Sequence, residues 1–283
     1  MTTEKKIQPY LIFLHIPKTA GYCLYKLLMT KYKKHEYIII NFSEHYWKIK
    51  ELQQNIDKIK LIMGHFSYGV HKYLPSKARY IYITVLREPI NRLISFYWHI
   101  YNVKENEYHY FARNMSFKEF IKNINDLETC HKVHCYFNNG QARQICCTNN
   151  IEDNNFIKNP ELLSDIFIKR LLNNFSLAGL TENFDATLLI IANIFNWKEI
   201  PCYNIIKGKK PANWTISDEE IELIKEYNKY DIQLYEFAQK NFYELLKKQS
   251  QSFKEELKKY SNFNKKHFNS KTQWVNKDFV YLR

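Results

Sequence analysis

Three short polar segments have the residue types needed to bind a phosphate-like anion and to move a proton. The first contains Lys18 and Thr19, in a loop bounded by Pro17 and Gly21. An apolar run of strand length precedes this loop and a helical pattern follows it, so the loop is expected to join a strand to the N-terminus of a helix. Backbone N–H groups and the helix dipole converge at such a point, which favours an anion. The lysine adds a mobile positive charge to the same point.

The other two segments carry an arginine with a serine, and a histidine. Arg87 follows a predicted strand, and Ser95 lies two turns into the helix predicted after it. A guanidinium offers a planar pair of donors to a phosphate, and a hydroxyl adds a directed one. His65 ends another predicted strand, where an imidazole can take a proton near neutral pH.

Each of these residues also has an ordinary interpretation. Arg87 could form an ion pair with Glu88 or another acid at the rim of a sheet. Ser95 could bond to the backbone of its own helix. His65 could be a hydrogen-bonded structural histidine, since the chain has ten histidines. The functional interpretation therefore depends on whether the fold brings these side chains together.

Strands alternate with helices along much of the chain, which predicts an α/β fold with a central, mostly parallel sheet flanked by helices. The segment 79–86 is the most strand-like, because it is rich in β-branched and aromatic residues. Ligands bind at the carboxyl ends of the strands in such sheets, so Lys18, His65 and Arg87 are expected at one edge. The predicted strands are 11–15, 37–40, 60–63, 79–86 and 175–180, and the predicted helices are 22–32, 43–56, 89–103, 182–195 and 217–247.

Composition and charge describe a globular chain that favours an anionic partner. The 283 residues are 45% hydrophobic and include only six glycines and seven prolines, so long flexible linkers are not expected. The net charge of +13 suits a nucleotide, a nucleic acid, an acidic glycan or a membrane surface. We expect one domain over 1–246. Residues 247–283, with ten lysine or arginine residues and three acidic ones, are expected to form a frayed basic extension.

Membrane-spanning, secreted and metal-binding proteins are disfavoured. No run of about eighteen apolar residues is present, and the first apolar run is too short for the core of a signal peptide. The expected location is therefore cytoplasmic, where the six cysteines would be free thiols. The segment Cys130–Cys135 places two cysteines and two histidines in six residues. Four ligands from one helical turn cannot easily surround a tetrahedral ion, so no metal is expected there.

Two other functions remain as alternatives to an enzyme with a phosphate-like cofactor. One is a P-loop nucleotide kinase, but the glycine spacing differs from the Walker pattern and Lys18 precedes the turn. The other is a non-catalytic protein that binds nucleic acid or another polyanion through its net charge and basic tail. Such binding would depend steeply on salt.

At these segments the chain resembles the PAPS-dependent sulfotransferases, especially the glycan-modifying branch that includes heparan sulfate 2-O-sulfotransferase. PAPS is 3′-phosphoadenosine 5′-phosphosulfate. The run His15–Gly21 is similar to the 5′-phosphosulfate loop of that branch, and 86–97 is similar to its 3′-phosphate motif. The likeness extends in order from about residue 11 to 242. The other similar segments are 139–143, 178–182 and 231–238.

The resemblance implies an O-sulfotransferase that transfers a sulfuryl group from PAPS to a hydroxyl, giving PAP and a sulfate ester. The implied acceptor is a saccharide or glycoconjugate, with a small metabolite as a further possibility. Lys18 would neutralise the leaving group, His65 would be the general base, and no metal would be required. Tyr22 and Cys23 stand where the branch usually has small hydroxyl residues. The implied cofactor-binding residues are Lys18, Thr19, Ala20, Gly21, Tyr22, Cys23, Arg87, Ser95, Arg143, Thr181 and Lys207.

Overall fold

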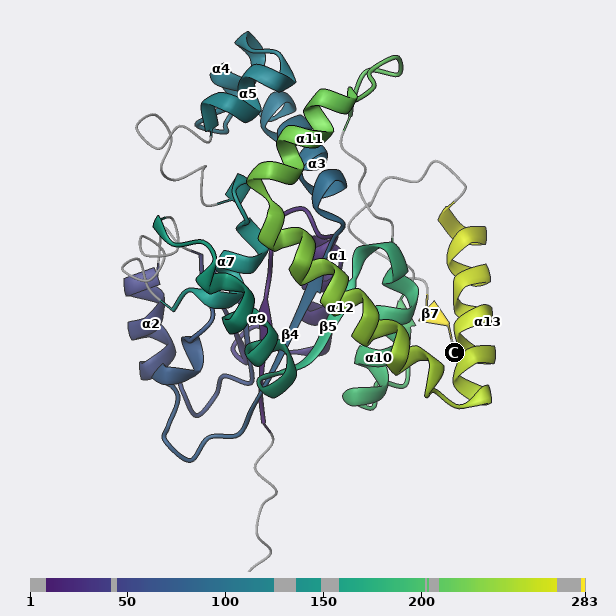
Figure 1. Ribbon diagram of the computed structural model, residues 1–283. Helices are drawn as coiled ribbons and strands as arrows, with labels where there is room; N and C mark the ends of the chain where they lie inside the picture. Colours follow the sequence, from purple (N-terminus) through teal and green to yellow (C-terminus); the bar gives the residue numbers. More distant parts are fainter. Residues whose placement is uncertain are drawn as a thin grey trace, which may run out of the picture.

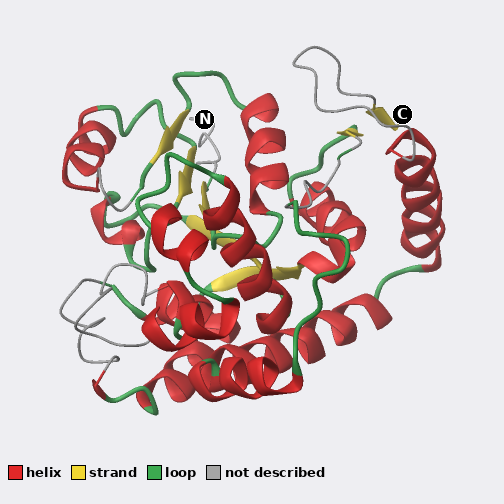
Figure 2. Cartoon of the chain, turned by 90° about the horizontal axis from the view of Figure 1, so that it is seen from above, coloured by secondary structure: helices red, strands yellow, loops and turns green. Residues whose placement is uncertain are grey.

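Five parallel strands form the centre of the molecule, in the order β2-β3-β1-β4-β5. The computed structural model describes residues 9–41, 45–124, 136–148, 158–201, 203, 209–268 and 281–282. Seen from above, the strands lie between helices on both sides (Figure 2). The predicted α/β class with a central parallel sheet is therefore confirmed. The strands are β1 (Tyr10–Leu14), β2 (Tyr37–Ile39), β3 (Leu61–Gly64), β4 (Tyr80–Leu86) and β5 (Phe175–Leu180).

The strands are apolar because both faces of the sheet are covered, as is usual for parallel sheets. The last four residues of β1 are completely buried. The register aligns Leu14 with Gly64 of β3, and Leu86 of β4 with Leu180 of β5. The carboxyl ends of these four strands therefore meet at one edge, and the residue after each of them lies at that edge.

Helices cover both faces of the sheet, and a further group of helices stands above its carboxyl edge. Figure 1 shows α7, α9 and α12 in front of the sheet, α1 behind it, and α3, α4, α5 and α11 together at the top. Within the described ranges, no helix has both the length and the apolar character needed to cross a bilayer. The helices are α1 (Gly21–Lys31), α2 (His45–Gln54), α3 (Pro89–Asn102), α4 (His109–Asn114), α5 (Phe117–Ile124), α7 (Gly140–Cys146), α9 (Leu162–Asn173), α10 (Phe184–Ile194), α11 (Asp218–Tyr227), α12 (Lys229–Lys247) and α13 (Gln251–Phe268), with short 3₁₀ turns at Val70–Tyr73 and Thr181–Asn183.

The prediction of one long helix over 217–247 is wrong, because the helix is interrupted at Asn228. The predicted start is confirmed: the hydroxyl of Ser217 accepts from the N–H of Glu220, whose carboxylate accepts in return from the N–H of Ser217. Asn228 leaves the helical conformation, with φ −126° and ψ 29°. Its side-chain oxygen accepts from the N–H of Asn139 at 3.0 Å, so the break between the two helices carries a contact with a segment distant in sequence.

The basic extension contains a packed helix instead of only a frayed segment. Helix α13 packs against α10, and Tyr260 on α13 is completely buried. The carboxylate of Asp185 accepts from the Tyr203 hydroxyl at 2.6 Å and from the Asn264 amide at 3.1 Å. A short strand β7 (Tyr281–Leu282) pairs antiparallel with β6 (Ile200–Pro201). A domain boundary at 246 stays a prediction.

Candidate functional site

The loop between β1 and α1 has the backbone shape of an anion-binding turn. Lys18 and Ala20 both have positive φ angles, 71° and 61°. Thr19 between them is buried, and its hydroxyl donates to the main-chain oxygen of Ile16 at 2.9 Å. The N-cap of α1 is Ala20, whose methyl side chain cannot cap the helix. The N–H groups of its first turn and the helix dipole are therefore suited to a bound anion.

Lys18 and Arg87 bring two positive charges to this loop. The Nη1 atom of Arg87 donates to the main-chain oxygen of Lys18 at 3.1 Å. Burial, followed by the charge of Arg87, lowers the pKa of Lys18 to about 8. Burial also lowers the pKa of Arg87, although the charges of Glu182 and Glu88 raise it. An anion bound between the two cations would favour their charged forms and raise both pKa values.

The strand β4 and helix α3 position the arginine and serine of the second predicted segment. Arg87 directly follows the last residue of β4, and Ser95 is half-buried on α3. His99 lies one turn beyond Ser95 on the same side of this helix. Burial, followed by the charge of Lys18, lowers the pKa of His99. The face of α3 that carries Ser95 and His99 therefore lies near the loop.

His65 and His15 form a pair of imidazoles on the other side of the loop. Their ring centroids are 4.3 Å apart, and Nδ1 of His65 lies 2.8 Å from the main-chain oxygen of His15. A carbonyl oxygen only accepts, so Nδ1 of His65 carries the hydrogen and Nε2 holds the lone pair of the neutral ring. Burial lowers the pKa of His65, which favours this neutral form at pH 7. The geometry suits a general base that acts through Nε2.

The His15 ring also explains the glycine at the start of α1. A Cβ atom on Gly21 would lie 2.1 Å from Cδ2 of His15 and 2.4 Å from its Nε2. The ring therefore packs directly against the main chain at the first residue of α1. It is also stacked on Phe13, with ring centroids 5.3 Å apart. Gly21 thus allows the His15 ring to pack against the start of α1.

Thr181 joins the loop to the neighbouring strands. Its hydroxyl lies 2.8 Å from the main-chain oxygen of Thr19 and 3.0 Å from that of Leu86. One hydroxyl hydrogen serves both acceptors, so Thr181 connects the end of β4 to the loop. The predicted contact between Thr181 and a cofactor stays a prediction.

The other predicted cofactor residues lie in different surroundings. Tyr22 is 51% exposed at the second position of α1, whereas Cys23 beside it is buried. Arg143 is 2% exposed within α7, so its guanidinium has little surface open to a ligand. Lys207 lies outside the described residues, as does the segment Cys130–Cys135. The cofactor contact of Lys207 and the absence of a metal at Cys130–Cys135 therefore stay predictions. The described residues contain no group of three or more potential metal ligands.

Four residues of the site were not identified as functional from the sequence. His15 and Gln141 lie in segments that were recognised, but their contacts with His65 and Arg87 link distant parts of the chain. His99 could have been found from its spacing of four residues from Ser95 on one helix. Glu182 also lies in a recognised segment, 178–182, but its contacts are with distant residues: its carboxylate accepts from the main-chain N–H of Glu88 at 3.1 Å and from the Tyr235 hydroxyl at 2.8 Å.

Comparison with known proteins agrees with this geometry. Two zebrafish (Danio rerio) proteins, heparan-sulfate 6-O-sulfotransferase 3-B and heparan-sulfate 6-O-sulfotransferase 2, are 26% and 23% identical to the chain over 194 and 190 residues. Each match covers 59% of this chain, but 43% and 39% of the relative. The mouse (Mus musculus) heparan-sulfate 6-O-sulfotransferase 3 is 26% identical over 191 residues, which are 58% of this chain and 38% of the relative. The chain thus spans about two fifths of the length of these curated relatives.

The names of these relatives refer to 6-O-sulfation, whereas the sequence resemblance was described with a 2-O enzyme as the example. The expected likeness to sulfotransferases of the glycan-modifying branch is confirmed. A family model described as the sulfotransferase family matches residues 6–238, which include the loop, the histidine pair, Arg87 and Thr181. The chain belongs to the sulfotransferase family.

Proposed function

We propose that this protein transfers a sulfuryl group from PAPS to a hydroxyl of a saccharide acceptor. The observation that carries the proposal is the contact between Arg87 and the main-chain oxygen of Lys18, at 3.1 Å. This contact places the Arg87 guanidinium beside a loop that is already suited to a phosphate. The loop and the guanidinium can therefore each bind one of two anionic groups of the same ligand. PAPS carries such groups at its 5′ and 3′ positions. Membership of the sulfotransferase family supports this choice of donor.

The residues of the loop would act on the leaving group. Sulfuryl transfer breaks the bond between sulfur and the oxygen of the 5′-phosphate, on which negative charge then develops. Lys18 and the N–H groups at the start of α1 are donors suited to this oxygen. Their hydrogen bonds to it strengthen as its negative charge grows, so they stabilise the transition state more than the bound substrate. Arg87 and Ser95 would hold the 3′-phosphate, which fixes the nucleotide for in-line transfer.

His65 would act on the acceptor. A new bond forms between sulfur and the acceptor oxygen, and the hydroxyl proton moves to Nε2 of His65. The bond from Nδ1 to the main-chain oxygen of His15 fixes the ring and its tautomer for this step. The order of the sheet supports this division of roles, because His65 follows β3 on one side of the loop and Arg87 follows β4 on the other.

A saccharide is proposed as the acceptor because the matched relatives are named as heparan-sulfate sulfotransferases. The cytoplasmic location expected from the sequence stays a prediction.

Thermal-shift measurements with a panel of nucleotides test the proposed function. PAP is expected to raise the melting temperature more than ADP or AMP, since a ligand of the native state stabilises it by mass action. A response to ATP with Mg²⁺ but not to PAP would instead favour a nucleotide kinase. Stabilisation by nucleic acid or heparin that disappears in salt, without a preference for PAP, would favour a polyanion-binding protein.

A further inference from the structure

The side-chain amide of Gln141 holds the main chain of Arg87 at both of its polar groups. The N–H of Arg87 donates to Oε1 of Gln141 at 3.0 Å, and Nε2 of Gln141 donates to the main-chain oxygen of Arg87 at 2.9 Å. The pairing of β4 with β5 ends one residue earlier, at Leu86 and Leu180. The amide therefore continues the hydrogen bonding of the sheet by one residue. Gln141 is completely buried, which shields its amide from water.

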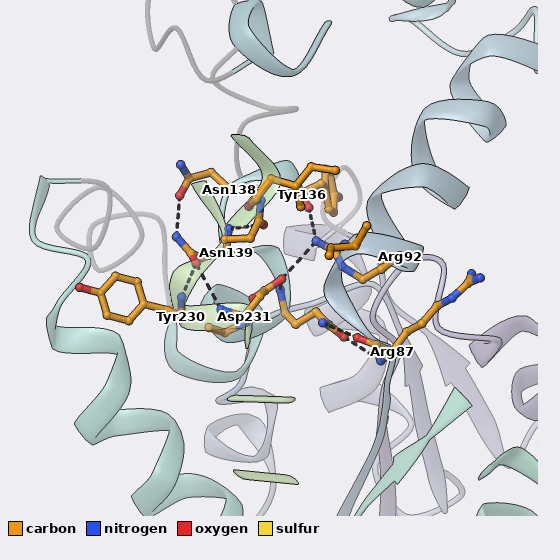
Figure 3. Close-up of polar contacts among 12 residues, drawn as sticks. Arg87, Arg92, Tyr136, Asn138, Asn139, Tyr230 and Asp231 are labelled. Carbon is orange, nitrogen blue, oxygen red and sulfur yellow. Dashed lines mark hydrogen bonds and ion pairs between the residues drawn. The ribbon is translucent and has the colours of Figure 1, made fainter. Parts of the chain in front are cut away.

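Gln141 is itself held by two helices that cap each other. The side-chain oxygen of Asn139, the N-cap of α7, accepts from the N–H groups of Tyr230 and Asp231 at 2.9 and 3.2 Å. In return, the carboxylate of Asp231 accepts from the N–H groups of Gln141 and Ala142 at 3.2 and 2.8 Å. The first turns of α7 and α12 thus supply hydrogen-bond acceptors for one another's free main-chain N–H groups. Figure 3 shows Asn139 and Asp231 at this junction.

A buried arginine fixes the junction to the helix that follows Arg87. Arg92 on α3 donates through Nη2 to Asp231 at 3.3 Å and to the main-chain oxygen of Tyr136 at 2.7 Å (Figure 3). The side chains of Arg92 and Asp231 are 1% and 0% exposed. Three helices therefore converge on the point from which Gln141 reaches Arg87, and the chain has little freedom to move there.

We infer that Gln141 is a positioning residue for recognition of the 3′-phosphate. It acts through Arg87, because a completely buried side chain behind the strand end does not touch the nucleotide. Its amide fixes the peptide groups of Arg87, and this directs the guanidinium toward the loop, where Nη1 meets the main-chain oxygen of Lys18. The inference rests on the proposed function, since it assigns the 3′-phosphate to Arg87.

The test compares two matched substitutions in α7. Gln141→Met removes the amide while keeping most of its length. Gln144→Met makes the same change three residues later, at a buried glutamine whose Nε2 donates to the main-chain oxygen of Phe66 at 3.3 Å. The readout is the ratio of the affinities for PAP and AMP, measured by isothermal titration calorimetry on the full chain. AMP lacks the 3′-phosphate, so the ratio reports recognition of that group alone.

Gln141→Met is expected to lower the PAP/AMP affinity ratio by about tenfold, because it removes the partner of both main-chain polar groups of Arg87. Gln144→Met is expected to keep the wild-type ratio, even if it lowers the melting temperature. In an Arg87→Met background, Gln141→Met should have no further effect on the ratio. Gln141→Asn, which keeps the amide but shortens the side chain so that it cannot reach both polar groups of Arg87, serves as a second variant if Gln141→Met does not fold.

The two hypotheses fail in different ways. A wild-type protein without a preference for PAP over AMP would contradict the proposed function. A wild-type preference for PAP that folded Gln141→Met or Gln141→Asn retains in full would overturn the role of Gln141 and leave the proposed function intact. An equal loss of PAP and AMP affinity in these variants would show a purely structural role and would also overturn the inference.

Discussion

Nδ1 of His65 lies 2.8 Å from the main-chain oxygen of His15, although 50 residues separate them in the sequence. Both histidines directly follow parallel strands, β3 and β1, which are neighbours in the sheet. The contact leaves Nε2 of the neutral His65 ring as the acceptor of a proton. The same ring pair lies next to the loop that carries Lys18. This relationship connects the proposed base to the proposed anion site.

Replacing His65 with alanine should lower kcat by about 10²–10⁴-fold, the usual contribution of a general base. The affinity for PAP should change little, because His65 lies on the side of the loop away from Arg87. The measurement is the rate of PAP formation from PAPS with a saturating acceptor, together with calorimetry of PAP binding. His35→Ala is the control, since His35 is exposed. Full activity of a folded His65→Ala protein would rule out the base.

The pH dependence of kcat/KM for PAPS should show two limbs. Burial holds the pKa of His65 below its ordinary value of 6.5, so the neutral base is lost only in acid, as pH falls through that lowered pKa. The protonated form of Lys18 is needed for the anion, and it is lost as pH rises through about 8. The rate should therefore be highest between the two and fall on either side.

Lys18→Arg gives a direct check on the alkaline limb. Arginine stays protonated far above pH 8, so the decline at high pH should move upward in this variant. The acid limb should stay where it is. If the alkaline limb is unchanged in Lys18→Arg, the limb must come from the titration of another group.

Lys18→Met should lower kcat by about 10²–10³-fold, as expected for the loss of one donor to a developing negative charge. PAP binding should weaken by a smaller factor, because the N–H groups of α1 remain. The matched control is Lys26→Met, which removes a lysine from α1, the helix that follows the loop. Its ammonium lies over the Tyr22 ring, 5.4 Å from the centroid. Equal losses in both variants would indicate a general effect of charge instead of a specific contact.

Asp231→Ala should lower the free energy of unfolding by about 3–5 kcal/mol, because it leaves the buried Arg92 charge without its carboxylate. The measurement is urea denaturation followed by tryptophan fluorescence. Adding Arg92→Met to Asp231→Ala should restore part of the loss. Asp218→Ala, at an exposed first-turn acid of α11, should cost less than about 1 kcal/mol. A small effect of Asp231→Ala would contradict the assigned role of the pair.

The sequence was sufficient to predict the sheet and the edge at which the site lies. The bounds of β5 are as predicted, β1 and β3 are each shifted by one residue, and β4 begins one residue later, because buried parallel strands are short apolar runs with clear limits. The rule that ligands bind at the carboxyl ends of such strands placed Lys18, His65 and Arg87 together. The contact between Arg87 and Lys18 agrees with that placement.

Contacts between distant segments could not be predicted in the same way. At the break between α11 and α12, Asn228 contacts Asn139, which is 89 residues away. The role of Gln141 depends on the docking of α7 against the end of β4, which no local pattern encodes. The packing of α13 depends on Asp185 and Asn264, which are 79 residues apart. In each case an amide or carboxylate satisfies a main-chain or polar group of another element, so its partner is known only once the fold is known.

The central claim is that one site recognises the phosphates at both ends of the nucleotide, with Arg87 at the 3′ end. Isothermal titration calorimetry with PAP and AMP on the wild-type protein and on Arg87→Met tests it most directly. Arg87→Met should lower the affinity for PAP by about 10–100-fold, the cost of hydrogen bonds to a charged group, and leave the affinity for AMP unchanged. Equal affinity of the wild-type protein for PAP and AMP, or an equal loss of both in Arg87→Met, would contradict the claim.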